Sequence, residues 1–280
     1  MAIVIPSPLV GPVIDSHCHL DVHDRHLHGE AAPEAEAMLA QARAVGVPKV
    51  VQIGCDVASA RWSVEFARSH PEVIAGVAIH PNDASRLVER QGSAALGAAL
   101  AVIEELAGDP VVRAVGETGL DYFRTKEAWR PAQRESFAWH IALASRLDKT
   151  LVIHDRDAHA DVIEILLAEG PPDRVIFHCF SGDAQMARTC ADHGWYMSFA
   201  GVITYRANDE LRQALACVPD DLLLVETDAP YLTPEPNRGK ANGSYLMPDT
   251  VRRMAQVRGV DEATICAQLW RNAQAAFGQW

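Results

Sequence analysis

Short apolar runs rich in β-branched residues alternate with longer amphipathic stretches eight times along the chain. This pattern predicts eight strands, each followed by a helix. The expected strands cover residues 13–19, 47–54, 73–80, 111–119, 150–156, 174–180, 195–201 and 222–228. The expected helices cover residues 33–45, 58–69, 94–106, 131–147, 158–169, 183–193, 209–218 and 248–259. Because runs such as VIFHCF are apolar almost throughout, we expect parallel strands that are covered on both faces.

Eight strand–helix units predict an α/β fold of the (β/α)8 (TIM) barrel class, with an extra C-terminal helix over residues 261–278. The alternative is a doubly wound open sheet, which usually carries a glycine-rich phosphate turn, and neither GxGxxG nor GxxxxGK[ST] occurs in this chain. No linker or low-complexity tract divides the 280 residues, so we predict one domain over residues 1–280. The stretch 233–248 has the composition of a loop.

Composition limits the partners and the compartment. The formal net charge is −12, which argues against a broad basic face for nucleic acid, so any polyanion would need a local positive site. No apolar run approaches the roughly 18 residues that a spanning helix requires, and we therefore expect no membrane contact. The six cysteines form no CxxC pair, which favours reduced thiols that act as small hydrophobes in a cytoplasmic protein.

Polar residues of the kinds that bind metals and anions stand at the C-terminal ends of the predicted strands, where barrel enzymes build their sites. These residues are His17, His19, His80, Glu117, Asp121, His154, Asp155, Arg156, His178, Glu226 and Asp228. A single inward histidine is usually a hydrogen-bonded core residue. Burying many ionisable groups without partners costs on the order of several kcal/mol each, and bound metal would remove that cost.

The number of candidate ligands predicts two metal ions. His17 and His19 lie two residues apart on a strand and face the same side, whereas Cys18 faces the helices. The full candidate set is His17, His19, Glu117, His154, His178 and Asp228. It exceeds the three or four ligands of one catalytic ion, so a pair of ions that share Glu117 fits better. Zn, Mn, Co, Fe or Mg would suit these ligands, and the sequence does not choose among them.

Six motifs at successive strand ends resemble the TatD family of metal-dependent deoxyribonucleases, in the right order over nearly the whole chain. They are IDSHCHLD (14–21), AIHP (78–81), VGETGLDY (115–122), VIHDRDA (152–158), FHCFSGD (177–183) and VETDAPYL (225–232). The resemblance implies a binuclear barrel hydrolase in which His17, His19 and Asp228 hold one ion. It also implies that His154 and His178 hold the other ion, that Glu117 bridges the two, and that the activity trims DNA from a 3′ end.

The resemblance suggests further roles for individual residues. We expect Asp228 to act as both a ligand and the base for the attacking water. His80 matches a position on the substrate side, where it could bind phosphate or assist the leaving oxygen, although a histidine before Pro81 could instead cap the strand end. Further substrate contacts are expected from Arg156, Tyr231 and Arg238, with Lys240 a weaker candidate.

One segment departs from the family pattern. After RGK many family members have Asn-Glu-Pro, where this chain has Asn242, Gly243 and Ser244. Contacts to substrate that depend on that glutamate are therefore in doubt. All of the expected metal ligands are present.

The interpretation is a cytoplasmic two-metal phosphodiesterase that acts on single-stranded DNA or DNA 3′ ends, with a monomer as one expectation. A first alternative is a small-molecule amidohydrolase or lactonase. Many of those enzymes bridge their metals with a modified lysine on the fourth strand, where this chain has Glu117. A second alternative is a non-catalytic binding protein, and the loss of a ligand would have been its signature.

Overall fold

The computed structural model describes residues 3–22 and 34–280, and it contains eight parallel strands that alternate with helices. The strands form one sheet in the order β1-β2-β3-β4-β5-β6-β7-β8, and Cys18 at the end of β1 bridges to Ala229 beyond β8. This order and alternation confirm the (β/α)8 barrel class. The predicted start of the first helix at Pro33 lies outside the described residues.

Contacts along the chain define two compact units, and each can be described by itself. The first unit comprises Met1–Gln52, Gly182–Ala275 and Gln279, and the second comprises Ile53–Ser181, Ala276–Gly278 and Trp280. Strand β2 (Lys49–Gly54) and helix α11 (Glu262–Phe277) contribute residues to both units. A single domain over the whole chain stays a prediction.

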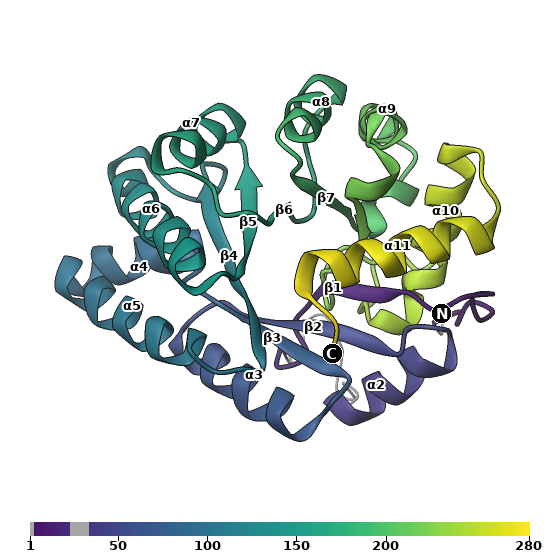
Figure 1. Ribbon diagram of the computed structural model, residues 1–280, viewed down its shortest axis with the longest axis horizontal. Helices are drawn as coiled ribbons and strands as arrows, with labels where there is room; N and C mark the ends of the chain where they lie inside the picture. Colours follow the sequence, from purple (N-terminus) through teal and green to yellow (C-terminus); the bar gives the residue numbers. More distant parts are fainter. Residues whose placement is uncertain (1–2, 23–33) are drawn as a thin grey trace. The chain divides into compact units, whose positions relative to one another are not determined.

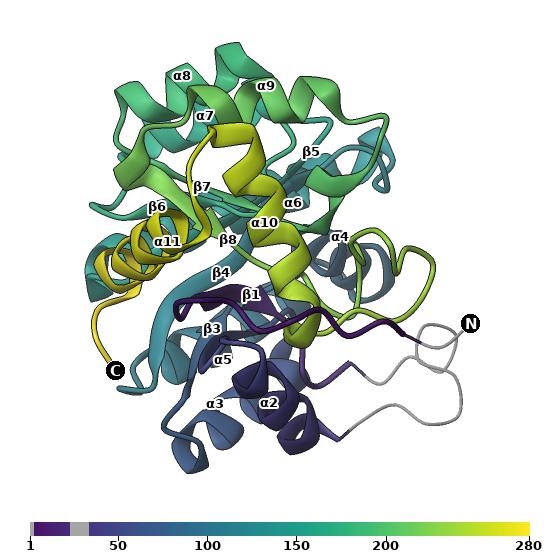
Figure 2. The same cartoon turned by 90° about the vertical axis from the view of Figure 1, so that its right-hand side faces the viewer.

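The first unit contains β1 (Ile14–Cys18), β7 (Tyr196–Phe199) and β8 (Leu223–Val225), and β7 pairs in parallel with β8. Its helices are α2 (Ala35–Ala44), α8 (Ala184–Asp192), α9 (Asp209–Cys217) and α10 (Met247–Arg258). Helix α9 lies beside α8 in both views (Figures 1 and 2) and also packs against α10. The three strands are almost wholly buried, which explains their apolar sequences.

The second unit contains β3 (Val73–Val77), β4 (Val112–Asp121), β5 (Thr150–Arg156) and β6 (Val175–Phe177), which pair in parallel in that order. Its helices are α3 (Val57–Ser69), α4 (Pro81–Gln91), α5 (Ser93–Ala107), α6 (Arg130–Leu147) and α7 (His159–Glu169). Strand β4 is the longest in the described chain, and its last five residues are buried although three of them are polar. Because polar side chains are seldom buried without a role, these three residues of β4 are candidate functional residues of the second unit.

Helix α4 corrects the sequence analysis, which left residues 81–93 without a secondary structure between a predicted strand and the next helix. The segment PNDASRLVERQ is mostly polar, yet Ala84, Leu87 and Val88 have the i, i+3, i+4 spacing of one helix face, a signal that the sequence analysis did not use. Pro81 occupies the first helical turn, and the His80 ring accepts a hydrogen bond from the backbone N–H of Asn82 at 3.0 Å. Proline at the start of a helix and a side-chain cap are ordinary initiation signals, and the strand prediction had absorbed His80.

Two further expectations concern membrane-spanning helices and the cysteines. Among residues 3–22 and 34–280, no helix has both the length and the apolar character that crossing a bilayer demands. All six cysteines are in the thiol form.

Candidate metal centre

Three imidazole rings of the second unit converge on one carboxylate oxygen of Glu117. His178 Nε2 lies 2.8 Å from Glu117 Oε2, His154 Nδ1 lies 3.1 Å from it and His80 Nε2 lies 3.7 Å from it. Glu117 lies within β4 and His154 within β5, whereas His178 directly follows β6 and His80 stands between β3 and α4. Glu117 is itself only 5% exposed. Ligand atoms of His80, Glu117 and His154 all lie within 4.8 Å of one another, so they are close enough to surround a cation.

Asp121 orients the His154 ring from the opposite side. Its Oδ2 lies 3.4 Å from His154 Nε2, and the carboxylate accepts hydrogen bonds from Asn82 Nδ2 and from the Arg124 backbone N–H, both at 2.8 Å. Burial alone would raise the pKa of Asp121, but these partners hold it below its ordinary value. Burial also lowers the pKa of His154, and its hydrogen bonds to Asp121 and Glu117 outweigh that effect and raise it. The ring is thus fixed with Nδ1 toward Glu117.

Cys55 holds the second oxygen of Glu117 and corrects the expectation that all cysteines act as small hydrophobes. Its Sγ donates to Glu117 Oε1 at 3.3 Å, and the residue is half-buried at the end of β2. Both oxygens of Glu117 therefore have partners, which fixes the carboxylate before any ligand arrives. Cys55 lies outside the predicted site because a cysteine after an apolar strand usually packs in the core.

His80 performs the capping role that the sequence left open, and this determines which of its nitrogens carries the proton. Because Nδ1 accepts from the Asn82 backbone N–H, the proton of the neutral ring resides on Nε2, the nitrogen that faces Glu117. Burial lowers the pKa of His80 to about 3, against the opposing effect of the Glu117 charge. The ring is therefore neutral near pH 7 and has an N–H to donate rather than a lone pair for a metal.

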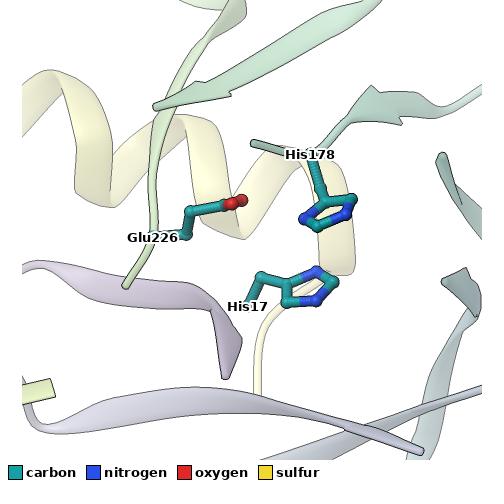
Figure 3. Close-up of side chains that lie close together, drawn as sticks. All are labelled: His17, His178 and Glu226. Carbon is teal, nitrogen blue, oxygen red and sulfur yellow. The ribbon is translucent and has the colours of Figure 1, made fainter. Parts of the chain in front are cut away.

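A second cluster lies in the first unit around β1 and the end of β8. His17 and His19 are buried with ring centroids 5.0 Å apart, and Asp228 Oδ1 lies 3.9 Å from His17 Nε2 and 3.4 Å from His19 Nε2. A Glu226 oxygen lies within 4.8 Å of a His17 ring nitrogen, and Figure 3 draws both side chains. Asp228 adopts a left-handed backbone with φ of 52°, and strained residues of this kind cluster at functional sites.

The segment that departs from the family pattern supports this second cluster. The buried Asp15 carboxylate accepts hydrogen bonds from Thr227 N (2.9 Å), Thr227 Oγ1 (2.6 Å) and Ser244 Oγ (2.7 Å). Burial raises the pKa of Asp15 to about 6, although these bonds oppose the shift. Asn242 Nδ2 donates to the Thr227 and Tyr231 carbonyls. Ser244 thus ties its loop to Asp15 and fixes the residue before Asp228.

The predicted substrate residues are found in both units. In the second unit the Arg156 guanidinium lies over the Phe123 ring, 4.0 Å from its centroid. In the first unit Arg238 lies over the Tyr205 ring at 4.2 Å, and Tyr231 is 41% exposed with its ring edge toward His19. All three side chains have enough accessible surface to contact a ligand.

The structure thus groups His80, Glu117, His154 and His178 in the second unit, and His17, His19 and Asp228 in the first. It adds Cys55 to the first group and Asp15 to the second. Asp121 was already among the polar residues expected at the strand ends, and its place four residues after Glu117 on one strand puts both side chains on the same side. Asp15 had no such signal, because only the folded chain brings Thr227 and Ser244 to it.

The donor chemistry fits divalent metal. Each cluster combines imidazole nitrogens with carboxylate oxygens, which suits Zn, Mn, Co or Fe and leaves Mg possible with water ligands. The partners of Glu117 and His154 already orient their donor atoms, as expected for ligands held ready for an ion.

Comparison with known proteins supports this interpretation. Residues 14–278 match the family described as TatD related DNase. The chain is 44% identical over 270 residues to an uncharacterized metal-dependent hydrolase, TatD, of Mycobacterium tuberculosis, covering 95% of this chain and 98% of the relative. It is 35% identical over 250 residues to the metal-dependent hydrolase YcfH of Escherichia coli, covering 89% of each chain. The crystal structure of YjjV, a TatD homolog from Escherichia coli, superposes with a TM-score of 0.84 at 24% identity over 96% of this chain and 98% of the other.

Proposed function

We propose that this chain, which belongs to the family of TatD-related DNases, hydrolyses phosphodiester bonds of DNA from a 3′ end. The chain is a metal-dependent hydrolase, as its relatives are described. The DNA substrate and the exonucleolytic direction are the proposal. The observation that carries it is the convergence of three imidazoles on one oxygen of Glu117, one of which, His80, presents an N–H donor instead of a metal-binding lone pair.

Two divalent ions, of Zn, Mn or Mg, are the proposed cofactors. We assign His17, His19 and Asp228 to one ion and His154 and His178 to the other, with Glu117 as the ligand of both. When bound, such ions neutralise phosphate charge and make a water molecule more acidic. Glu117 suits the shared position because one of its oxygens already has several nitrogens around it.

We assign proton acceptance and hydrogen-bond donation to two residues of the chain. Asp228, held by its backbone N–H bond to the His17 carbonyl at 2.9 Å, would accept the proton of the attacking water. His80 would donate its Nε2 proton in a hydrogen bond to a phosphate oxygen or to the leaving oxygen. A neutral donor in a buried site stabilises developing negative charge without first losing a proton to solvent.

Arg156, Arg238 and Tyr231 are the proposed contacts to the rest of the strand. The arginines would pair with phosphates and the tyrosine would stack against a terminal base. Against a net charge of −12, this contact area must be small, and we expect modest affinity with a shallow salt dependence, because few phosphates are neutralised. We place the protein in the cytoplasm on the basis of its thiols, as a monomer with one domain.

The proposed function is tested with single-stranded DNA labelled at either end. We expect metal-dependent release of mononucleotide from the 3′-labelled strand at once, with the 5′ label staying on shortening fragments, and no product after chelation. Early release from the 5′-labelled strand would reverse the direction. Turnover of esters or lactones with no cleavage of DNA would favour an amidohydrolase instead.

Replacing His80 with asparagine separates its two roles. Asparagine is a good helix cap and can still accept the Asn82 N–H, but it has no nitrogen in the position of Nε2. We expect kcat on DNA to fall about 100-fold while metal content and thermal stability stay at wild-type values. The metal content is measured by elemental analysis. Loss of an ion in His80→Asn would show that His80 is a ligand and would contradict the assignment.

A further inference from the structure

Phe123 is an exposed aromatic residue in the loop that follows β4. Its side chain is 62% exposed, although a phenyl group is ordinarily buried. The Arg156 guanidinium lies 4.0 Å from the ring centroid, so the ring has a cation on one side and retains most of its surface for another partner. No step of the proposed reaction uses Phe123.

The loop that carries Phe123 is held in place by hydrogen bonds on both sides of the ring. The Tyr122 backbone N–H donates to the Arg156 carbonyl at 2.9 Å, and the Arg124 backbone N–H donates to Asp121 Oδ1 at 2.8 Å. Thr125 Oγ1 donates to Asn82 Oδ1 at 2.9 Å. The exposure of Phe123 is therefore a fixed feature of the fold. A partner would find the ring already positioned, which reduces the entropy lost on binding.

The segment that carries Phe123 is positively charged in a protein that is acidic overall. Residues 122–134 contain Arg124, Lys126, Arg130 and Arg134 and a single acidic residue, Glu127. Arg134 pairs with Asp161. In the part of the chain that the structure describes, no acidic side chain forms an ion pair with Arg124, Lys126 or Arg156. An aromatic ring among unpaired cations suits a single-stranded nucleic acid, which offers both a base to stack and a phosphate to neutralise.

The position of Phe123 relative to the metal centre agrees with this partner. Strands β4 and β5 run side by side (Figure 1), with His154 opposite Gly119 and Arg156 opposite Asp121. Phe123 lies in the turn that ends β4, only two residues from Asp121, the carboxylate that orients His154.

We infer that Phe123, backed by Arg156, is a stacking platform for a nucleobase of a single-stranded DNA substrate next to the cleaved bond. The inference rests on the proposed function for the identity of the ligand. Arg156 then has a second role. Its guanidinium contacts the Phe123 ring, while the remaining N–H groups of the guanidinium face the phosphate. Phe123 is thus a specificity residue that distinguishes a strand with bases from a bare sugar–phosphate chain.

The test compares two strands that differ only in their bases. Fluorescence anisotropy measures binding of the holoprotein to a labelled strand of about twelve nucleotides, with phosphorothioate linkages at the 3′ end that resist cleavage. The second strand has the same length and charge but consists of abasic units. We expect wild type to bind the strand with bases about ten-fold more tightly, and Phe123→Ala to lose this preference without weaker binding of the abasic strand.

Two variants serve as controls. Phe123→Trp retains a stacking face and should keep the preference. Leu167→Ala removes another exposed apolar side chain, 45% exposed on α7, and should change nothing. Equal binding of both strands by wild type, or a preference that survives in Phe123→Ala, would overturn the inference. The 3′-label assay then distinguishes two kinds of failure. Cleavage of DNA without a base preference would contradict the stacking platform alone. A base preference that depends on Phe123, without cleavage, would contradict the proposed function alone.

Discussion

Replacing Glu117 with alanine is expected to remove both the bound metal and the activity. One oxygen of this carboxylate lies within 3.7 Å of three imidazole nitrogens, and the other accepts from Cys55. Without it, the histidines lose their common counter-charge and the two ions lose the proposed shared ligand. We expect the metal content to fall from about two equivalents to less than one, and kcat/KM on single-stranded DNA to fall by about 10³-fold or more.

Elemental analysis and the 3′-label assay measure these two effects on the same preparation. Glu104→Ala is the matched control, because Glu104 is a half-exposed glutamate in α5 that pairs with surface Arg146. It should retain metal and activity, since exposed ion pairs contribute little. If Glu117→Ala kept two equivalents of metal and half of the wild-type rate, Glu117 could not be the shared ligand and the binuclear proposal would fail.

Replacing Gly119 with alanine is expected to give the largest loss of stability of any single change considered for this protein. Gly119 has φ of +131°, and a Cβ built on it would lie 2.1 Å from the His154 carbonyl oxygen. That oxygen belongs to the neighbouring strand β5, so neither partner can move without breaking the β4–β5 pairing. We expect the free energy of unfolding to fall by about 4 kcal/mol, through backbone strain and steric overlap together.

The comparison variant for Gly119 is Gly259→Ala. Gly259 ends α10 with φ of 66° and would place its Cβ in open space, so only the conformational strain of about 1 kcal/mol remains. Urea unfolding followed by circular dichroism measures both changes. A Gly119→Ala protein as stable as Gly259→Ala would mean that β4 and β5 can separate locally. Because His154 lies opposite Gly119, any surviving Gly119→Ala protein should also bind less metal.

The Asp15 network shows what the segment that departs from the expected family pattern does in this chain. Where the resemblance leads us to expect Asn-Glu-Pro, this chain has Asn242, which donates to two backbone carbonyls, and Ser244, whose hydroxyl donates to buried Asp15. A serine can supply a hydrogen bond that a proline in the same place cannot. The segment therefore supports the backbone around Asp228, whatever contact to substrate the missing glutamate would have made.

The periodicity of the chain determined the fold class. Strands buried on both faces require continuous apolar runs, and covering helices require one apolar stripe, so the two element types alternate visibly in the sequence. Most predicted elements agree with the structure to within a few residues, for example residues 150–156 with β5 and 131–147 with α6. Helix α4 was missed because the predicted strand had absorbed its cap, His80, and the short apolar stripe of Ala84, Leu87 and Val88 was not counted as a helix.

The sequence by itself also determined which side chains stand at the strand ends, because parallel strands place their C-terminal residues on one side of a sheet. Only the tertiary structure decided what each of them does. The Asn82 N–H made His80 a donor, Cys55 and Asp121 fixed the groups they touch, and a braced loop left Phe123 exposed. The physical reason is range: a repeat along the chain specifies the direction of a side chain, whereas its protonation, orientation and exposure depend on atoms that only folding brings near.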